Sequence, residues 1–267
     1  MSEQNPPVDI VFGWGDSIAK GFGADFKQGW MQRLEAAYYD TNRRPQATFY
    51  NLSVPGETCE SFYRRVQNEA SSRQGTSLRG EKRHCLSVVS LGGQDIFTDV
   101  AQGRDPAEVR HVRKFFVPAV QTLLKLGDVL YVGIPPCNEE RIRQRFARLY
   151  NASLEGINRR IWTQEALLDY MVGYSARVTG PQRAYEAVSL MNEGGTPDNI
   201  VVRPELISPD GEHPNQAGHD WIYRRTLPVF NQLVAREIEV DSFVPADHDL
   251  FGEVLTGLDA PGATLRL

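Results

Sequence analysis

Several features that mark specialised classes of protein are missing from this sequence. Its three cysteines, Cys59, Cys85 and Cys137, are widely spaced and form neither a disulfide framework nor a Cys-x-x-Cys metal motif. No apolar run reaches the roughly eighteen residues of a transmembrane helix, so stable membrane insertion is not expected. The formal net charge of -5 provides no basic surface for nucleic acid. The sequence therefore argues against membrane-spanning and nucleic-acid-binding functions.

The two ends of the chain suggest where the protein works and how it is divided. Residues Met1 to Asp9 lack the basic and apolar segments of a signal peptide, which favours a cytoplasmic protein, or a secreted one if a natural leader was trimmed. The 267 residues show no repeat and no linker, so residues 1–240 are expected to form one domain. Residues 241–267 are expected to be an extension that packs on this domain or on a partner subunit, which leaves a homo-oligomer open.

Short apolar runs alternate with longer amphipathic stretches along the chain. Such alternation predicts an α/β fold with a mostly parallel central sheet covered by helices on both faces. Functional sites in such sheets form outside the carboxyl ends of the strands. The glycine-rich stretch Ala166–Asn199 is interpreted as a helical excursion over the site. Strands are expected at Val8–Trp14, Ala47–Leu52, Leu86–Leu91 and Asp128–Ile134, and helices at Trp30–Asp40, from about Thr58, at Pro106–Leu126 (capped by Asp105) and at Asn215–Glu237.

The first predicted strand leads into Gly15-Asp16-Ser17-Ile18. A sharp turn from strand to helix here would expose the Ser17 hydroxyl and place free backbone N–H groups beside it. An acyl-transfer nucleophile needs this exposure and these donors. The same residues also suit a plain helix cap with Asp16 filling the turn, and alone they do not decide between the two interpretations.

A second motif, Asp210-Gly211-Glu212-His213-Pro214, lies far along the chain. Asp210 stands three residues before His213, so its carboxylate can face one ring nitrogen while the other nitrogen faces a nucleophile. This spacing is common by chance and indicates a catalytic pair only together with other motifs.

Two glycine turns follow the second and third predicted strands. Gly56 offers a backbone N–H after the second strand, and Gln94 offers a side-chain amide N–H after the third. With the Ser17 N–H, these groups would form a three-donor oxyanion hole. For either turn taken alone, an ordinary glycine turn is the preferred interpretation.

In their order along the chain, the four motifs resemble the blocks of the SGNH hydrolases, also called the GDSL-like lipase/esterase family. The resemblance extends from Val8 to His219, which is most of the chain. The nucleophile, glycine, Gly-Gly-Asn-Asp and final blocks of the family correspond to Gly15–Ile18, Asn51–Thr58, Leu91–Asp95 and Asp210–Asn215.

The resemblance implies a flavodoxin-like three-layer α/β/α sandwich and an ester hydrolase without metal or cofactor. Ser17 would attack the ester carbonyl, with His213 as base and Asp210 as its orienter. Ser17, Gly56 and Gln94 would form the oxyanion hole. The expected substrate is a small-molecule carboxylic ester, with a short acyl or O-acetyl group favoured by the polar residues around the last two blocks. A lysophospholipase or acyl-thioesterase is the alternative.

Gln94 is the one departure from the family pattern, which has Asn at this position. Glutamine carries the same carboxamide donor on a side chain that is one methylene longer. The donor chemistry is therefore kept, while its reach and orientation change. A catalytically weak member that binds carbohydrate or lipid is the alternative of a different class.

Two other parts of the sequence partly match motifs for nucleotide or metal binding. Gly13 to Ile18 begins like a dinucleotide fingerprint, but Ile18 replaces the last glycine and Asp16 would repel a pyrophosphate. The pairs Glu81/His84 and Glu108/His111 have the spacing of carboxylate-bridged metal ligands. No further ligands are indicated for either pair, so all four are interpreted as solvated polar positions and no metal is expected.

Two remaining features are given structural interpretations. His219 follows His213 by six residues at the start of the last predicted helix, and a packing or capping role is favoured over that of a second base. Glu139–Arg148 has acids early and bases late, which suits the dipole of a solvent-facing helix.

Overall fold

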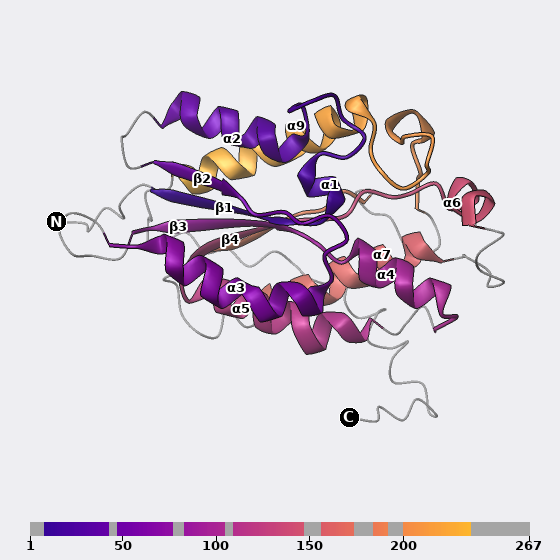
Figure 1. Ribbon diagram of the computed structural model, residues 1–267, viewed down its shortest axis with the longest axis horizontal. Helices are drawn as coiled ribbons and strands as arrows, with labels where there is room; N and C mark the ends of the chain where they lie inside the picture. The colour runs from indigo at the N-terminus through magenta and orange to yellow at the C-terminus, as the bar shows by residue number, and fades with distance from the viewer. Residues whose placement is uncertain are drawn as a thin grey trace. The chain divides into compact units, whose positions relative to one another are not determined.

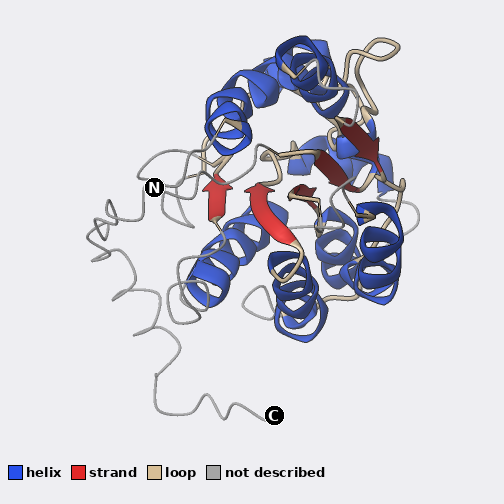
Figure 2. Ribbon diagram, turned by 90° about the vertical axis from the view of Figure 1, so that its left-hand side faces the viewer, coloured by secondary structure: helices blue, strands red, loops and turns tan. Residues whose placement is uncertain are grey.

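A parallel β-sheet lies at the centre of the fold (Figures 1 and 2). The structure is a computed structural model that describes residues 8–42, 47–76, 83–104, 109–146, 156–173, 184–191 and 200–235. In this part of the chain the sheet has five strands in the order β2-β1-β3-β4-β5, and every neighbouring pair is parallel. The strands are β1 (Ile10–Gly15), β2 (Thr48–Asn51), β3 (Cys85–Ser90), β4 (Gly127–Val132) and β5 (Tyr185–Val188).

Helices cover both faces of the sheet and complete the three layers that the sequence predicts. Helices α2 and α9 lie on one face, and α3 and α5 lie on the other (Figure 1). The α-helices are α1 (Ser17–Lys20), α2 (Trp30–Thr41), α3 (Cys59–Gln74), α4 (Gly93–Ala101), α5 (Val117–Leu124), α6 (Glu139–Phe146), α7 (Ile157–Leu168) and α9 (Gln216–Val234). Two π-helices, η1 (Val112–Phe116) and η2 (Asp169–Gly173), and a 3-10 helix, η3 (Pro204–Leu206), complete the described elements.

The side chains of β1 alternate between two apolar layers. Ile10, Phe12 and Trp14 pack with helices α3 and α5, whereas Val11 packs with α2 and α9 on the opposite face. Every residue of β1, β3 and β4 is buried, because helices cover both faces. Strands buried on both faces have nearly continuous apolar sequences. This burial explains why these strands are evident in the sequence as apolar runs.

The position of the site follows from the strand order. The chain runs from β1 outward to β2, then returns to the other side of β1 with β3, so the connections reverse direction between β1 and β3. Such a switch point opens a crevice at the carboxyl ends of the strands. Ser17 follows β1 directly, and Gln94 lies in the first turn of α4 after β3.

One element departs from the sequence prediction. Ala166–Asn199 was expected to be helical, and the expectation holds for its described start through Gly173. Strand β5 then contradicts it, since Tyr185–Val188 pairs with β4 at the edge of the sheet. This strand has only four residues, and Glu186 and Ala187 are exposed, so neither a long apolar run nor a clear alternation marks it.

The helix predicted at Pro106–Leu126 is present in its described part, where the π-turn of η1 continues into α5. Its expected cap, Asp105, and first residue, Pro106, lie outside the described residues, as does the tail 241–267. Among the helices that the structure does describe, none has both the length and the apolar character required to cross a membrane.

Candidate active site

Ser17 lies at the turn between β1 and α1. Asp16 caps the helix, with its Oδ1 accepting a hydrogen bond of 3.0 Å from the backbone N–H of Ile18. The four-residue helix ends at Gly21, so Ser17 stands on a short, sharp turn at the carboxyl edge of the sheet. Burial raises the pKa of Asp16 to about 6, although the hydrogen bond from Ile18 opposes the shift. The predicted strand-to-helix turn is therefore present.

The loop that carries His213 is closed by its own backbone. Ile207 and Pro214 form an antiparallel bridge, and the Ser208 N–H donates to the His213 carbonyl over 2.8 Å. Gly211 has a φ of +84°, and a Cβ at this position would lie 2.6 Å from the Cβ of Arg141. Only glycine satisfies both constraints, and this fixes the turn on which the histidine stands.

Asp210 holds the loop and the imidazole together. Its Oδ1 accepts hydrogen bonds from the backbone N–H groups of Glu212 and His213, and its Oδ2 lies 2.7 Å from His213 Nδ1. Partial burial opposes ionisation of Asp210, but the hydrogen bonds from the His213 ring and the two backbone groups outweigh it and lower its pKa. The carboxylate is therefore held in its charged form beside the ring.

Ser17, His213 and Asp210 form one hydrogen-bonded series. His213 Nε2 lies 2.9 Å from Ser17 Oγ, although 196 residues separate the two in the chain. The ring of Phe22 lies beside the imidazole, with centroids 5.7 Å apart. The structure thus brings the three residues of the predicted triad into contact.

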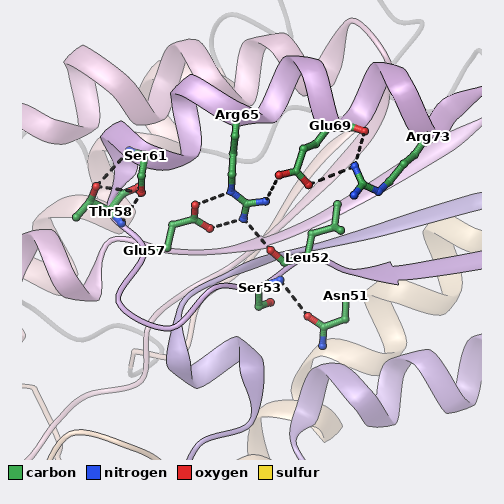
Figure 3. Close-up of polar contacts among 9 residues, drawn as sticks. All are labelled: Asn51, Leu52, Ser53, Glu57, Thr58, Ser61, Arg65, Glu69 and Arg73. Atoms are coloured by element: carbon green, nitrogen blue, oxygen red, sulfur yellow. Dashed lines mark hydrogen bonds and ion pairs between the residues drawn. The ribbon is translucent and has the colours of Figure 1, made fainter.

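The loop that carries Gly56 is held by the polar network of Figure 3. The carboxylate of Glu57 is buried and pairs with Arg65, whose Nε donates over 2.6 Å. Arg65 also donates to the Leu52 carbonyl over 2.7 Å, so one guanidinium ties the start and the end of the loop to α3. The first turn of α3 is closed by a reciprocal capping box between Thr58 and Ser61.

Gln94 lines the same small cavity as Ser17 and Gly56. The volume of this cavity is about 40 Å³. The Gln94 amide Nε2 lies 3.4 Å from Thr98 Oγ1, one turn along α4, and this is a long hydrogen bond. The three predicted oxyanion donors therefore surround one cavity, while the Gln94 amide is directed to its own helix.

A buried hydrogen-bond network, not predicted from the sequence, lies behind the motif Leu91–Asp95. Gln164 of α7 is fully buried, donates to the Leu91 carbonyl over 2.9 Å, and contacts His111 Nε2 through its Oε1 at 2.9 Å. Asp95 Oδ2 accepts from the Cys59 N–H over 2.9 Å and so joins α4 to the start of α3. Asp95 belongs to a recognisable motif, but a single glutamine in an unpredicted helix has no signal in the sequence.

The two histidines of the predicted metal-spaced pairs are not solvated, contrary to expectation. His84 and His111 are both 8% exposed. His84 Nε2 lies 3.2 Å from Asp128 Oδ2, and His111 lies beside Asp99 and Gln164. The partner of His84 lies on strand β4, and those of His111 lie on helices α4 and α7, contacts that the sequence spacing does not reveal. Glu81 and Glu108 lie outside the described residues.

His219 and α6 have the structural roles that the sequence predicts. His219 is buried, its Nε2 donates to the Phe22 carbonyl over 2.8 Å, and its burial lowers its pKa. Ile142 is the buried residue of α6, while Arg143 and Glu140 pair on its exposed side. Among the described residues, no group of three or more His, Cys, Asp or Glu is placed to hold a metal ion.

A serine hydroxyl, an imidazole and a carboxylate in series are the arrangement of serine hydrolases. The chain belongs to the GDSL-like lipase/acylhydrolase family, whose family model matches residues 11–226. It is thus a member of a family of ester hydrolases, and both the resemblance and the fold predicted from the sequence are confirmed.

Individual relatives agree with this assignment. The chain is 28% identical to Esterase TesA of Pseudomonas aeruginosa over 140 residues, which are 52% of this chain and 61% of TesA. Two solved structures share the fold at lower identity. One is a member of the lipolytic protein G-D-S-L family from Veillonella parvula (16% identity, TM-score 0.55, covering 84% of this chain and 99% of that one). The other is LAE5, an alpha/beta hydrolase enzyme from the metagenome of Lake Arreo (15% identity, TM-score 0.55, covering 84% and 95%).

Proposed function

We propose that this protein hydrolyses carboxylic esters through an acyl-enzyme formed on Ser17, without a metal ion. The observation that carries the proposal is the series Ser17 Oγ, His213 Nε2, His213 Nδ1 and Asp210 Oδ2, with separations of 2.9 and 2.7 Å. In the first step His213 takes the Ser17 proton as Oγ attacks the ester carbonyl, and Asp210 stabilises the imidazolium. His213 then protonates the departing alcohol, and water repeats the sequence to release the acid.

The tetrahedral oxyanion would be stabilised by the Ser17 and Gly56 N–H groups and by the Gln94 amide. All three residues line the cavity that contains the nucleophile. Donors of this kind act on charge that develops only in the transition state, so each contributes mainly to kcat. The Gln94 amide would exchange its long contact with Thr98 for the oxyanion.

A short acyl group fits the space beside Ser17 best. The cavity of about 40 Å³ has room for only a few water-sized groups, since a cavity needs about 10–15 Å³ of such volume to hold one water. This supports an acetyl or similarly small acyl group over the long chains of a lysophospholipase or acyl-thioesterase. The contact of Gln94 with Thr98 is the observation that favours the second candidate function, a catalytically weak member that binds carbohydrate or lipid. Turnover of nitrophenyl acetate distinguishes this ligand-binding protein from an active esterase.

The central test is the Ser17→Ala variant. Its kcat on nitrophenyl acetate is expected to fall by about 10⁴-fold or more, because the nucleophile is lost. Ser72→Ala, an exposed serine of α3, is the matched control and keeps full activity. A fluorophosphonate probe is expected to label Ser17, and a tryptic peptide map identifies the labelled residue. Unchanged turnover in Ser17→Ala, with wild-type circular dichroism, contradicts the proposal.

The proposed domain organisation has its own test. Residues 1–240 would carry the whole site, with 241–267 as an extension that contacts this domain or a partner subunit in a cytoplasmic homo-oligomer. A chain shortened after residue 240 is then expected to keep ester turnover. Size-exclusion chromatography of both lengths reports whether the tail joins subunits.

A further inference from the structure

A second and larger cavity lies beside the candidate active site. Its volume is about 410 Å³, within the range of roughly 300–1,000 Å³ that is typical of small-molecule sites. Its walls come from the loops after β4 and β5, from η3 and from the start of α9. They are largely apolar and include Leu190, Leu206, Ile207, Pro214, Trp221 and Ile222.

This cavity is lined in part by the loop that carries His213. Glu212 and Pro214, the two chain neighbours of His213, both belong to its wall. Pro135 and Glu212 belong at once to this wall and to that of the cavity containing Ser17. The two spaces therefore meet at Pro135 and Glu212, and Glu212 is the residue that directly precedes His213.

The chemistry of ester hydrolysis assigns different parts of the substrate to the two sides. The oxyanion must lie against Gly56 and Gln94, which line only the small cavity. The imidazole must reach the oxygen of the departing alcohol in order to protonate it. Because Glu212 and Pro214 flank His213 and both line the larger cavity, an alcohol portion that lies beside the imidazole has this cavity within reach.

We propose that the larger cavity binds the alcohol portion of the substrate and that this portion is apolar. The proposal rests on the ester hydrolase function argued above and narrows its substrate class to short-acyl esters of apolar alcohols. Arg203, Glu212 and Arg225 are the charged members of a wall whose other residues are mostly apolar. Along this apolar part a sugar would lose hydrogen bonds to water, which is unfavourable. An alkyl or aromatic alcohol gains from the same walls, about fourfold in affinity for each methylene buried.

Trp221 contributes an aromatic ring to the wall of this cavity. The guanidinium groups of Arg203 and Arg225 each lie 5.6 Å from its ring centroid, and both residues also line the cavity. These contacts hold the indole in place, so the aromatic wall is already formed before a ligand arrives.

Isomeric esters test which part of the substrate enters the cavity. Hexyl acetate and ethyl hexanoate have the same composition, and butyl acetate and ethyl butyrate form a second such pair. The wild-type kcat/KM, measured by acid release in a pH-stat, is expected to be at least tenfold higher for hexyl acetate than for ethyl hexanoate. It is also expected to rise from ethyl through butyl to hexyl acetate. Equal values within the pairs, or a preference for ethyl hexanoate, overturn the proposal.

The Val201→Trp variant ties the preference to this cavity. Val201 lines the cavity and is 51% exposed, so an indole there narrows the entrance without crowding the core. The ratio of kcat/KM for hexyl acetate over ethyl acetate is expected to fall at least tenfold. Tyr170→Trp, at an exposed position outside both cavities, is the matched control and keeps the wild-type ratio.

The outcomes separate this inference from the proposed function. An unchanged ratio in Val201→Trp, with both esters still hydrolysed in a Ser17-dependent manner, overturns the alcohol site alone. Hydrolysis that survives in Ser17→Ala overturns the serine mechanism itself.

Discussion

Gln164 occupies the space that a side chain at Gly92 would need. A Cβ on Gly92 would lie 2.2 Å from Gln164 Oε1, and Gly92 has a φ of +113° that favours glycine in any case. From the same position Gln164 donates to the Leu91 carbonyl, so one buried side chain supports the turn that precedes Gln94. The contact makes Gln164 a positioning residue for Gln94, the proposed third oxyanion donor.

Replacing Gln164 by leucine is therefore expected to affect catalysis as well as stability. The Leu91 carbonyl and His111 would each lose a buried partner, which destabilises the fold by about 1–3 kcal/mol. A displaced turn misplaces the oxyanion donor, so kcat is expected to fall about tenfold at little change in KM. Gln144→Leu on the exposed side of α6 is the control. Reduced stability with unchanged kcat of the folded protein would assign Gln164 a structural role only.

Gln94 itself is tested by truncation. If its amide reaches the oxyanion, Gln94→Ala is expected to lower kcat by about 10²–10³-fold with little effect on KM. Gln94→Glu is expected to be at least as damaging, because a carboxylate would face the oxyanion. Thr98→Val removes the long contact to the amide together with the 2.7 Å hydrogen bond from the Thr98 hydroxyl to the Gln94 carbonyl, and it is expected to leave kcat within about threefold. A loss below about tenfold in Gln94→Ala removes Gln94 from the site.

Chelation separates the serine mechanism from metal-dependent hydrolysis. A Ser-His-Asp mechanism generates its nucleophile without a cation, whereas a metal-activated water disappears with the metal. Prolonged dialysis against EDTA is expected to leave the rate of nitrophenyl acetate hydrolysis unchanged. Loss of activity on dialysis and its recovery with an added divalent cation would point instead to metal chemistry.

Asp16 is expected to make stability depend on pH. Burial raises its pKa from 3.8 to about 6, so the folded state holds this proton more tightly than the unfolded state does. The stabilisation is fully present below about pH 4 and is lost as the pH rises through about 6. Asp16→Asn keeps an acceptor for the Ile18 N–H but does not titrate.

The variant is therefore expected to gain about 1–3 kcal/mol relative to wild type between pH 4 and pH 7. Urea unfolding at several pH values measures this difference, with the exposed Asp25→Asn as control. A stability difference that does not change with pH contradicts the assignment of the shift to Asp16.

The features that could be predicted from the sequence are those that depend on neighbouring residues. β1 and β3 can be predicted from their apolar runs because both of their faces are buried. The turn at Ser17 and the loop from Asp210 to His213 are likewise local, since each is held by hydrogen bonds over two or three residues. The family resemblance rests on such local motifs and on their order.

Features that depend on contacts between distant residues became evident only in the folded protein. The approach of Ser17 to His213 spans 196 residues, and the support of Leu91 by Gln164 spans 73. Strand β5 is defined by its pairing with β4 rather than by its own four residues. The larger cavity is bounded by loops and helices from separate parts of the chain, so no single segment encodes it. These residues come together only when the sheet packs between its two helical layers. No pattern among neighbouring residues in the sequence predicts that packing.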